Sequence, residues 1–93
     1  MKIKVENMIS DKGNYLPNQF KIYKDDSIYF QSYQTIIAKV NKRTMYNDEI
    51  ILDYDALNYS RTTSKHLYRF LGMNRKEIQK RIKGGWIKYK NLN

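Results

Sequence analysis

The chain has 93 residues but no cysteine, and His66 is its only histidine. Without cysteine, disulfides and thiolate metal sites are excluded. A single histidine without cysteine also cannot found a zinc site or a familiar nucleophile–base pair. No apolar run approaches the roughly 20 residues of a transmembrane helix, and the N-terminus lacks the apolar stretch of a signal peptide. We therefore expect no metal, no cofactor and no membrane contact.

Acidic residues are nearly missing from the last third of the chain. Residues 60–93 hold ten Lys and Arg but one acid, Glu77, whereas residues 1–59 hold eight residues of each sign. The formal net charge of +9 therefore resides wholly in the C-terminal third. Such an asymmetry favours a face that meets a polyanion or an acidic partner.

The first part of the chain has the alternation of strands. Hydrophobic residues make up 41% and aromatic residues 14%, which indicates one folded domain, 1–93, and not a basic disordered tail. Polar and apolar residues alternate, or β-branched residues cluster, in five stretches separated by turn-forming residues, with a break at Pro17 and Asn18. These stretches are 2–5, 20–23, 28–31, 35–40 and 49–53. We expect an antiparallel meander with one face covered.

The period changes near residue 60. Leu67, Phe70 and Leu71 recur at helical spacing and predict a helix that ends at Gly72. Asn74 predicts the cap of a second helix, roughly 75–83, which Gly84 and Gly85 end. Residues 86–90 alternate again and predict a possible final strand. The fold class is α+β: an antiparallel sheet of four or five short strands, then two short helices packed on one face.

The strongest candidate site is the basic second helix with its flanks. Its apolar stripe is only Ile78 and Ile82, so most of its surface is cationic and exposed, and such a face binds phosphates with salt dependence. Aromatic side chains are interleaved and could stack on bases or pack on a protein. The alternative is a solvated surface helix. The residues expected to contact a partner or nucleic acid are Arg61, Lys65, Arg69, Arg75, Lys76, Lys80, Arg81, Lys83, Trp86, Lys88 and Tyr89.

Residues 62–83 also resemble a helix-turn-helix. Gly72 falls in the turn, a cap follows, and the basic residues of the second helix would face the major groove. Tyr68 stands where the motif commonly has a small residue, and the first helix is short. An ordinary pair of antiparallel helices gives the same pattern.

A third candidate is acidic. Glu49, Asp53 and Asp55 are evenly spaced, so they would share one face of a strand, and three carboxylates could hold Mg²⁺ for a nuclease. No companion lysine or histidine has a clear role nearby. Polar residues at the exposed end of a strand are the favoured interpretation, so we expect no enzymatic activity.

Several segments resemble a known family. They are 18–20 (NQF), 29–33 (YFQSY), 36–38 (IIA), 59–65 (YSRTTSK), 70–71, 83–84 and 91–93. The family consists of small phage- and prophage-encoded proteins of unknown function. The resemblance implies a viral, bacteriophage origin and action in the cytoplasm of an infected bacterial host, but it brings no functional residue with it. Small phage proteins without enzyme motifs often inhibit host defence, as anti-CRISPR proteins do.

The segment 59–65 has its own physical interpretation. Hydroxyls crowd the start of the first helix, and Arg61 and Lys65 flank them four residues apart. Hydroxyls, helix N-terminal amides and two cations suit an anion. The alternative is a junction in which Arg61 and the hydroxyls pin the helix to the sheet.

These observations give two expectations for function. The first is a non-enzymatic inhibitor of a host nucleic-acid-directed defence system, which binds a host nucleoprotein or nuclease through the basic C-terminal helical face. The alternative is a DNA- or RNA-binding regulator that contacts nucleic acid directly through the helix-turn-helix-like unit. Binding of the isolated protein to generic duplex distinguishes them.

Overall fold

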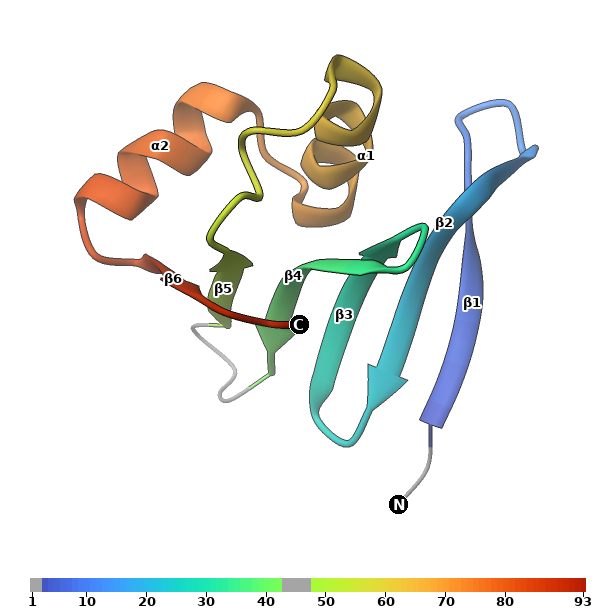
Figure 1. Ribbon diagram of the computed structural model, residues 1–93, viewed down its shortest axis with the longest axis horizontal. Coiled ribbons are helices and arrows are strands. Elements are labelled where there is room, and N and C mark those ends of the chain that lie inside the picture. The colour runs from blue at the N-terminus through green and yellow to red at the C-terminus, as the bar shows by residue number, and fades with distance from the viewer. Residues whose placement is uncertain (1–2, 43–47) are drawn as a thin grey trace.

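The computed structural model describes residues 3–42 and 48–93, and it contains one sheet and two helices (Figure 1). The first five strands run in chain order across the sheet, each antiparallel to the one before it. They are β1 (Ile3–Ile9), β2 (Tyr15–Lys24), β3 (Ser27–Ser32), β4 (Thr35–Asn41) and β5 (Glu49–Asp53). Then come α1 (Arg61–Leu71), α2 (Arg75–Lys83) and a final strand, β6 (Ile87–Lys90). The predicted α+β fold class is confirmed.

The last strand pairs differently from the others. β6 lies beside β5 and runs parallel to it, with Ile87 opposite Ile50 and Tyr89 opposite Leu52. A parallel pair needs a long connection, and the two helices supply it. β1 and β6 are therefore the two edges of the sheet, and α2 lies near the β5–β6 end of the sheet, away from β1 (Figure 1).

The prediction of a break at Pro17 and Asn18 was wrong, because β2 runs through both residues. Proline is tolerated there because β2 pairs with β3 only from Gln19 onward, so the Pro17 nitrogen needs no partner on that side. Asn18 adopts a left-handed φ of 61° and its carbonyl accepts a bond from the Tyr33 amide at 2.7 Å. After the stretch 35–40 the sequence predicts a turn at residues 41–43; Asn41 instead belongs to β4, and Arg43 lies outside the described residues.

The sequence predicts the end of the first helix at Gly72 and the cap of the second at Asn74, and the structure has both; of the several hydroxyl residues near the start of the first helix, Ser60 is its cap. The Ser60 and Asn74 side chains accept bonds from the amides of Thr63 and Glu77, which caps α1 and α2. Gly72 closes α1 in the left-handed conformation, with φ of 69°, because few other residues adopt it without strain. No helix within residues 3–42 and 48–93 has the length and apolar character needed to cross a bilayer.

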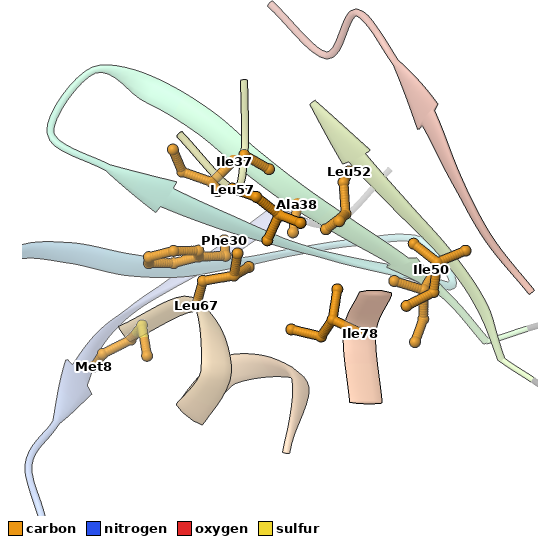
Figure 2. Packing of buried hydrophobic residues seen from close by; sticks show 11 residues of the cluster. Met8, Phe30, Ile37, Ala38, Ile50, Leu52, Leu57, Leu67 and Ile78 are labelled. Carbon is orange, nitrogen blue, oxygen red and sulfur yellow. The ribbon is translucent and has the colours of Figure 1, made fainter. Parts of the chain in front are cut away.

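The core lies between the sheet and the helices. Figure 2 shows Leu67 of α1 and Ile78 of α2 pointing toward the strands, and both are fully buried together with Phe30. A bulge in β4, where the pairing with β3 shifts, leaves Ile37 as an extra residue, so Ile37 and Ala38 are both buried in the same cluster. The core members are Met8, Phe30, Ile37, Ala38, Ile50, Leu52, Ala56, Leu57, Leu67, Ile78 and Ile87.

Candidate nucleic-acid interface

The exposed side of α2 carries a stripe of lysines. Lys76, Lys80 and Lys83 recur at positions i, i+4 and i+7, so they line one side of the helix, roughly opposite to the side that buries Ile78. All three lysines are exposed and none forms an ion pair with a described residue. We call Lys76, Lys80 and Lys83 the lysine stripe. Its charge is available to an anionic partner.

Few cations of the C-terminal third are neutralised by acids. Arg69 pairs with Asp11 at 2.7 Å, and Arg81 pairs with Glu77 at 3.0 Å. The other eight Lys and Arg of residues 60–93 have no acidic partner among the described residues. Of these eight, Arg75 donates to the Leu57 carbonyl, and the side chains of the other seven form no hydrogen bond or ion pair with a described residue, so their charge is available to a partner.

Beyond the C-terminal end of α2, Trp86 stands out from the surface with 69% of its area exposed. Its backbone is fixed: the Trp86 amide donates to the Arg81 carbonyl at 2.8 Å, and the Gly85 amide donates to the Ile82 carbonyl at 3.1 Å. This is the Schellman arrangement, in which Gly85 takes the left-handed conformation with φ of 83°. The geometry therefore holds an exposed aromatic ring directly beside the basic helix.

The Trp86 indole packs closely over the backbone of Gly84. A Cβ atom added at Gly84 would lie 3.0 Å from Trp86 Cδ1, so the indole would have to shift by a few tenths of an ångström to accommodate it. A cleft of about 600 Å³, which we call the Trp86 cleft, is lined by Trp86, Gly84, Lys80 and Lys83 of the lysine stripe, and the Glu77–Arg81 ion pair. Because Gly84 has no side chain, the indole packs against the backbone at the end of α2, and the opposite face of the ring stays open to a ligand.

A second cleft, the Tyr59 cleft, lies where the start of α1 meets the start of α2. It has a volume of about 450 Å³ and is lined by Tyr59, Arg61, Ser64, Lys65, Tyr68 and Arg75. The Arg75 guanidinium donates to the Leu57 carbonyl at 3.1 Å, which positions it at the cleft. Burial, and then the charges of Asp53 and Asp55, raise the pKa of Tyr59 above its ordinary value.

The two clefts both border α2: the Tyr59 cleft reaches its first residue, and the Trp86 cleft extends from Glu77 past its C-terminal end. Arg75 borders the Tyr59 cleft, Lys83 borders the Trp86 cleft, and their eight-residue separation on α2 corresponds to about 12 Å. Each cleft combines cations with aromatic side chains. The helix therefore joins two places that could each hold a phosphate beside a ring.

The remaining predicted site residues lie elsewhere. Arg69 is held by Asp11 of the β1–β2 turn. Lys88 is exposed, on the face of β6 opposite to the buried Ile87. Tyr89 packs against the core. The sequence did not single out Gly84, whose contact with Trp86 needs the fold, nor Tyr59 as a lining residue, although Tyr59 directly precedes the Ser60 cap.

The three acidic residues do not share a strand face. β5 ends at Asp53, and Asp55 lies exposed in the turn that follows. Glu49 accepts a bond from Asn41 Nδ2 at 2.7 Å. Asp53 is buried and its Oδ1 accepts bonds from the Leu92 amide and Asn93 Nδ2. Within the described residues no three His, Asp or Glu side chains gather as metal ligands would.

The comparisons with known proteins identify a family but no activity. The chain belongs to a family of unknown function, DUF8033, whose model matches residues 3–86. No curated protein and no solved structure matches the chain. The function therefore has to be argued from the surface described above.

Proposed function

We propose that this protein is a small, non-enzymatic nucleic-acid-binding protein, with the lysine stripe on the phosphate backbone and Trp86 stacked on a base. The observation that carries the proposal is the Trp86 cleft, where an exposed indole lies beside the unpaired Lys80 and Lys83. Cations that follow the backbone, next to a ring on which a base can stack, are the two components of single-strand recognition. Either component alone has a simpler explanation as ordinary surface.

Unpaired nucleotides fit this surface better than a continuous duplex. A ring can stack on a base only where the base is unstacked from its neighbours, as in single strands, loops and ends. The Tyr59 cleft, which reaches Arg75 at the start of α2, offers a second group of cations for another phosphate of the same strand. The helix-turn-helix alternative would use α2 in the major groove of duplex DNA and would make Trp86 dispensable.

The biological setting is a narrower proposal. The resemblance to phage-encoded proteins favours an inhibitor of a host nucleic-acid-directed defence nuclease, acting in the cytoplasm of an infected bacterium. Such a machine holds RNA or displaced single-stranded DNA, which is the class of ligand that the lysine stripe and Trp86 suit. Capture of partners from infected cells, with and without nuclease treatment, tests the setting: partners lost with the nuclease support a nucleic-acid contact, and partners retained indicate a protein surface.

Direct binding tests the core of the proposal. Fluorescence anisotropy with labelled single-stranded and duplex oligonucleotides should show tighter binding of the single strand. The double variant Lys76→Glu, Lys80→Glu should weaken binding by more than about tenfold, because two phosphate contacts become repulsions. A matched control, Lys12→Glu with Lys24→Glu, changes the net charge equally on the β1–β2 hairpin and should retain most of the affinity. Equal losses in both variants would mean that only overall charge matters.

A further inference from the structure

The free edge of β1 carries more apolar surface than an edge strand should. Ile3 and Val5 are 59% and 60% exposed on one face of the strand. On the opposite face Lys4 and Glu6 form an ion pair within the strand at 3.2 Å. Natural edge strands are usually protected by lysine, proline or cover, because their unpaired backbone groups can pair with another chain. Here one lysine stands beside an acid, which cancels that protection.

The regular part of β1 is centred on Val5. The pairing of β1 with β2 is continuous over residues 3–7 and then shifts at a bulge between Asn7 and Ile9. A bulge twists the edge and ends regular pairing. An incoming strand would therefore meet residues 3–7, whose middle residue is Val5.

The charges of this segment are self-complementary. If a second copy of β1 pairs antiparallel about a two-fold axis at Val5, Lys4 lies opposite Glu6 of the second copy, and Glu6 lies opposite its Lys4. Directly opposed charges of opposite sign stabilise an antiparallel pair, and like charges destabilise it. No other centre in this segment places both ion pairs together, so the sequence selects one register.

The apolar face matches in the same register. Val5 pairs with Ile22, which pairs with Tyr29, so these three side chains form a row on the sheet face opposite to Phe30. With the two copies joined at Val5, the row continues from one sheet into the other, and the exposed Val5 side chains flank each other, while Ile3 lies opposite Asn7 of the second copy. The sheet becomes continuous across both copies.

We propose that β1 is a homodimerisation edge, and that its partner is β1 of a second copy of this chain. This inference is independent of the nucleic-acid proposal, because β1 and α2 lie at opposite ends of the sheet (Figure 1). In the dimer the two lysine stripes lie at the two far ends of the joined sheet and both remain exposed.

Charge reversal and charge swap test the pairing, with the full chain and sedimentation equilibrium as the readout. Wild type should dimerise reversibly. Lys4→Glu or Glu6→Lys alone should weaken the dimer by at least about tenfold, since the two-fold axis makes each change act twice. The double variant Lys4→Glu, Glu6→Lys should restore the dimer, and Lys12→Glu, in the turn beyond the paired segment, should leave it unchanged. Circular dichroism checks the fold of each variant.

Each result decides the matter. A chain that stays monomeric at every concentration overturns the proposal. A dimer whose affinity is unchanged by both single reversals also overturns it, because such a dimer would form through another face. A double variant that does not regain the wild-type dimer affinity overturns it as well, because the proposed register would then be wrong. If a reversal does not fold, Lys4→Gln and Glu6→Gln replace it, and a weakened dimer in each is the expected result.

Discussion

Phe70 of α1 stacks on Phe30 of β3, with ring centroids 5.5 Å apart and ring planes inclined by 28°. Phe30 is fully buried, whereas Phe70 is only partly buried at the margin of the core. The pair joins the first helix to the centre of the sheet, and Leu67, one turn earlier on α1, fills the adjoining space. The position of α1, and through it that of the Tyr59 cleft, depends on this contact.

Truncation of these residues should follow their burial. We expect Phe30→Ala to lower the free energy of unfolding by about 3–5 kcal/mol and Leu67→Ala by about 2–5 kcal/mol, because each leaves a cavity in a closed core. Phe70→Ala should cost less, because part of its ring already contacts solvent. Urea unfolding measures all three. Tyr54→Ala, at an exposed site, is the control and should shift stability by about 0.5 kcal/mol or less. A Phe30→Ala variant as stable as the control would contradict the packing.

Asp53 should be a structural residue. Its buried carboxylate accepts from the Leu92 amide at 2.9 Å and from Asn93 Nδ2 at 3.2 Å, and the Asn93 side chain also bonds both the amide and the carbonyl of Ile36. These bonds hold the last residues across the ends of β4 and β5. Asp53→Ala should therefore destabilise the fold by about 1–3 kcal/mol, since the hydrogen bonds from the Leu92 amide and the Asn93 side chain to a charged group are lost. Thermal denaturation checks this, and Asp55→Ala, at an exposed position, should have almost no effect.

Catalysis is tested on the same residues. We expect no cleavage of plasmid DNA by the pure protein with Mg²⁺ or Mn²⁺, because Asp53 is engaged with the chain end and Asp55 lies outside the strand. Cleavage that Asp53→Asn abolishes while the protein stays folded would overturn the non-enzymatic assignment.

The stability of the fold should fall on mild acidification. Burial lowers the pKa of His66 below its ordinary 6.5, and the charges of Arg69 and Lys65 lower it further. Its Nδ1 is buried with no hydrogen-bond partner among the described residues. The unfolded chain therefore binds a proton on His66 before the folded chain does, so stability is lost as the pH falls through 6.5 toward the lowered pKa.

The variant His66→Gln isolates this effect. Between about pH 7 and pH 5, below which carboxylates begin to titrate, the free energy of unfolding should fall for wild type and change less for the variant. Denaturant titrations at several pH values give both curves. Parallel curves would show that His66 is protonated equally in the folded and unfolded chain.

Trp86 offers a direct optical test, because it is the only tryptophan of the chain. Its fluorescence should be that of an exposed indole and should be quenched when a single-stranded oligonucleotide stacks on it. Trp86→Ala should weaken binding by about 1–3 kcal/mol, and Trp86→Phe, which keeps an aromatic face, should weaken it less. An affinity that Trp86→Ala leaves unchanged would favour contact through phosphates alone.

Local signals predicted much of this structure. The apolar run in residues 49–53, the stop at Gly72 and the cap at Asn74 depend on neighbours within a few positions, so the corresponding boundaries agree with the structure. The parallel pairing of β6 with β5 depends on residues far apart in the chain, and alternation alone does not name a strand's partner. The prediction of a break at Pro17 was wrong for the same reason. Whether β2 can accommodate a proline depends on where its pairing with β3 ends, which local sequence does not show.

In the candidate site too, the features set by nearby residues were predicted from the sequence and those set by tertiary contacts were not. Composition placed the net charge in the last third of the chain. The helical spacing of Ile78 and Ile82 predicted that the other faces of the second helix, which carry the lysine stripe, are exposed to solvent. The neutralisation of Arg69 by Asp11, more than fifty positions away, and the packing of Tyr89 on the core are tertiary contacts that no local pattern carries. The contact of Trp86 with Gly84 is close in sequence, but it depends on the turn that Gly85 forms.

The salt dependence of oligonucleotide binding tests the central claim most directly. Affinities of wild type and of Lys76→Glu, Lys80→Glu for one single-stranded oligonucleotide are measured between about 50 mM and 200 mM salt. If both lysines neutralise phosphates, the slope of log affinity against log salt should be shallower in the variant by about 0.7 per lost contact. The same steep slope and the same affinity in both proteins would contradict the account, because the lysine stripe would then be only a solvated surface.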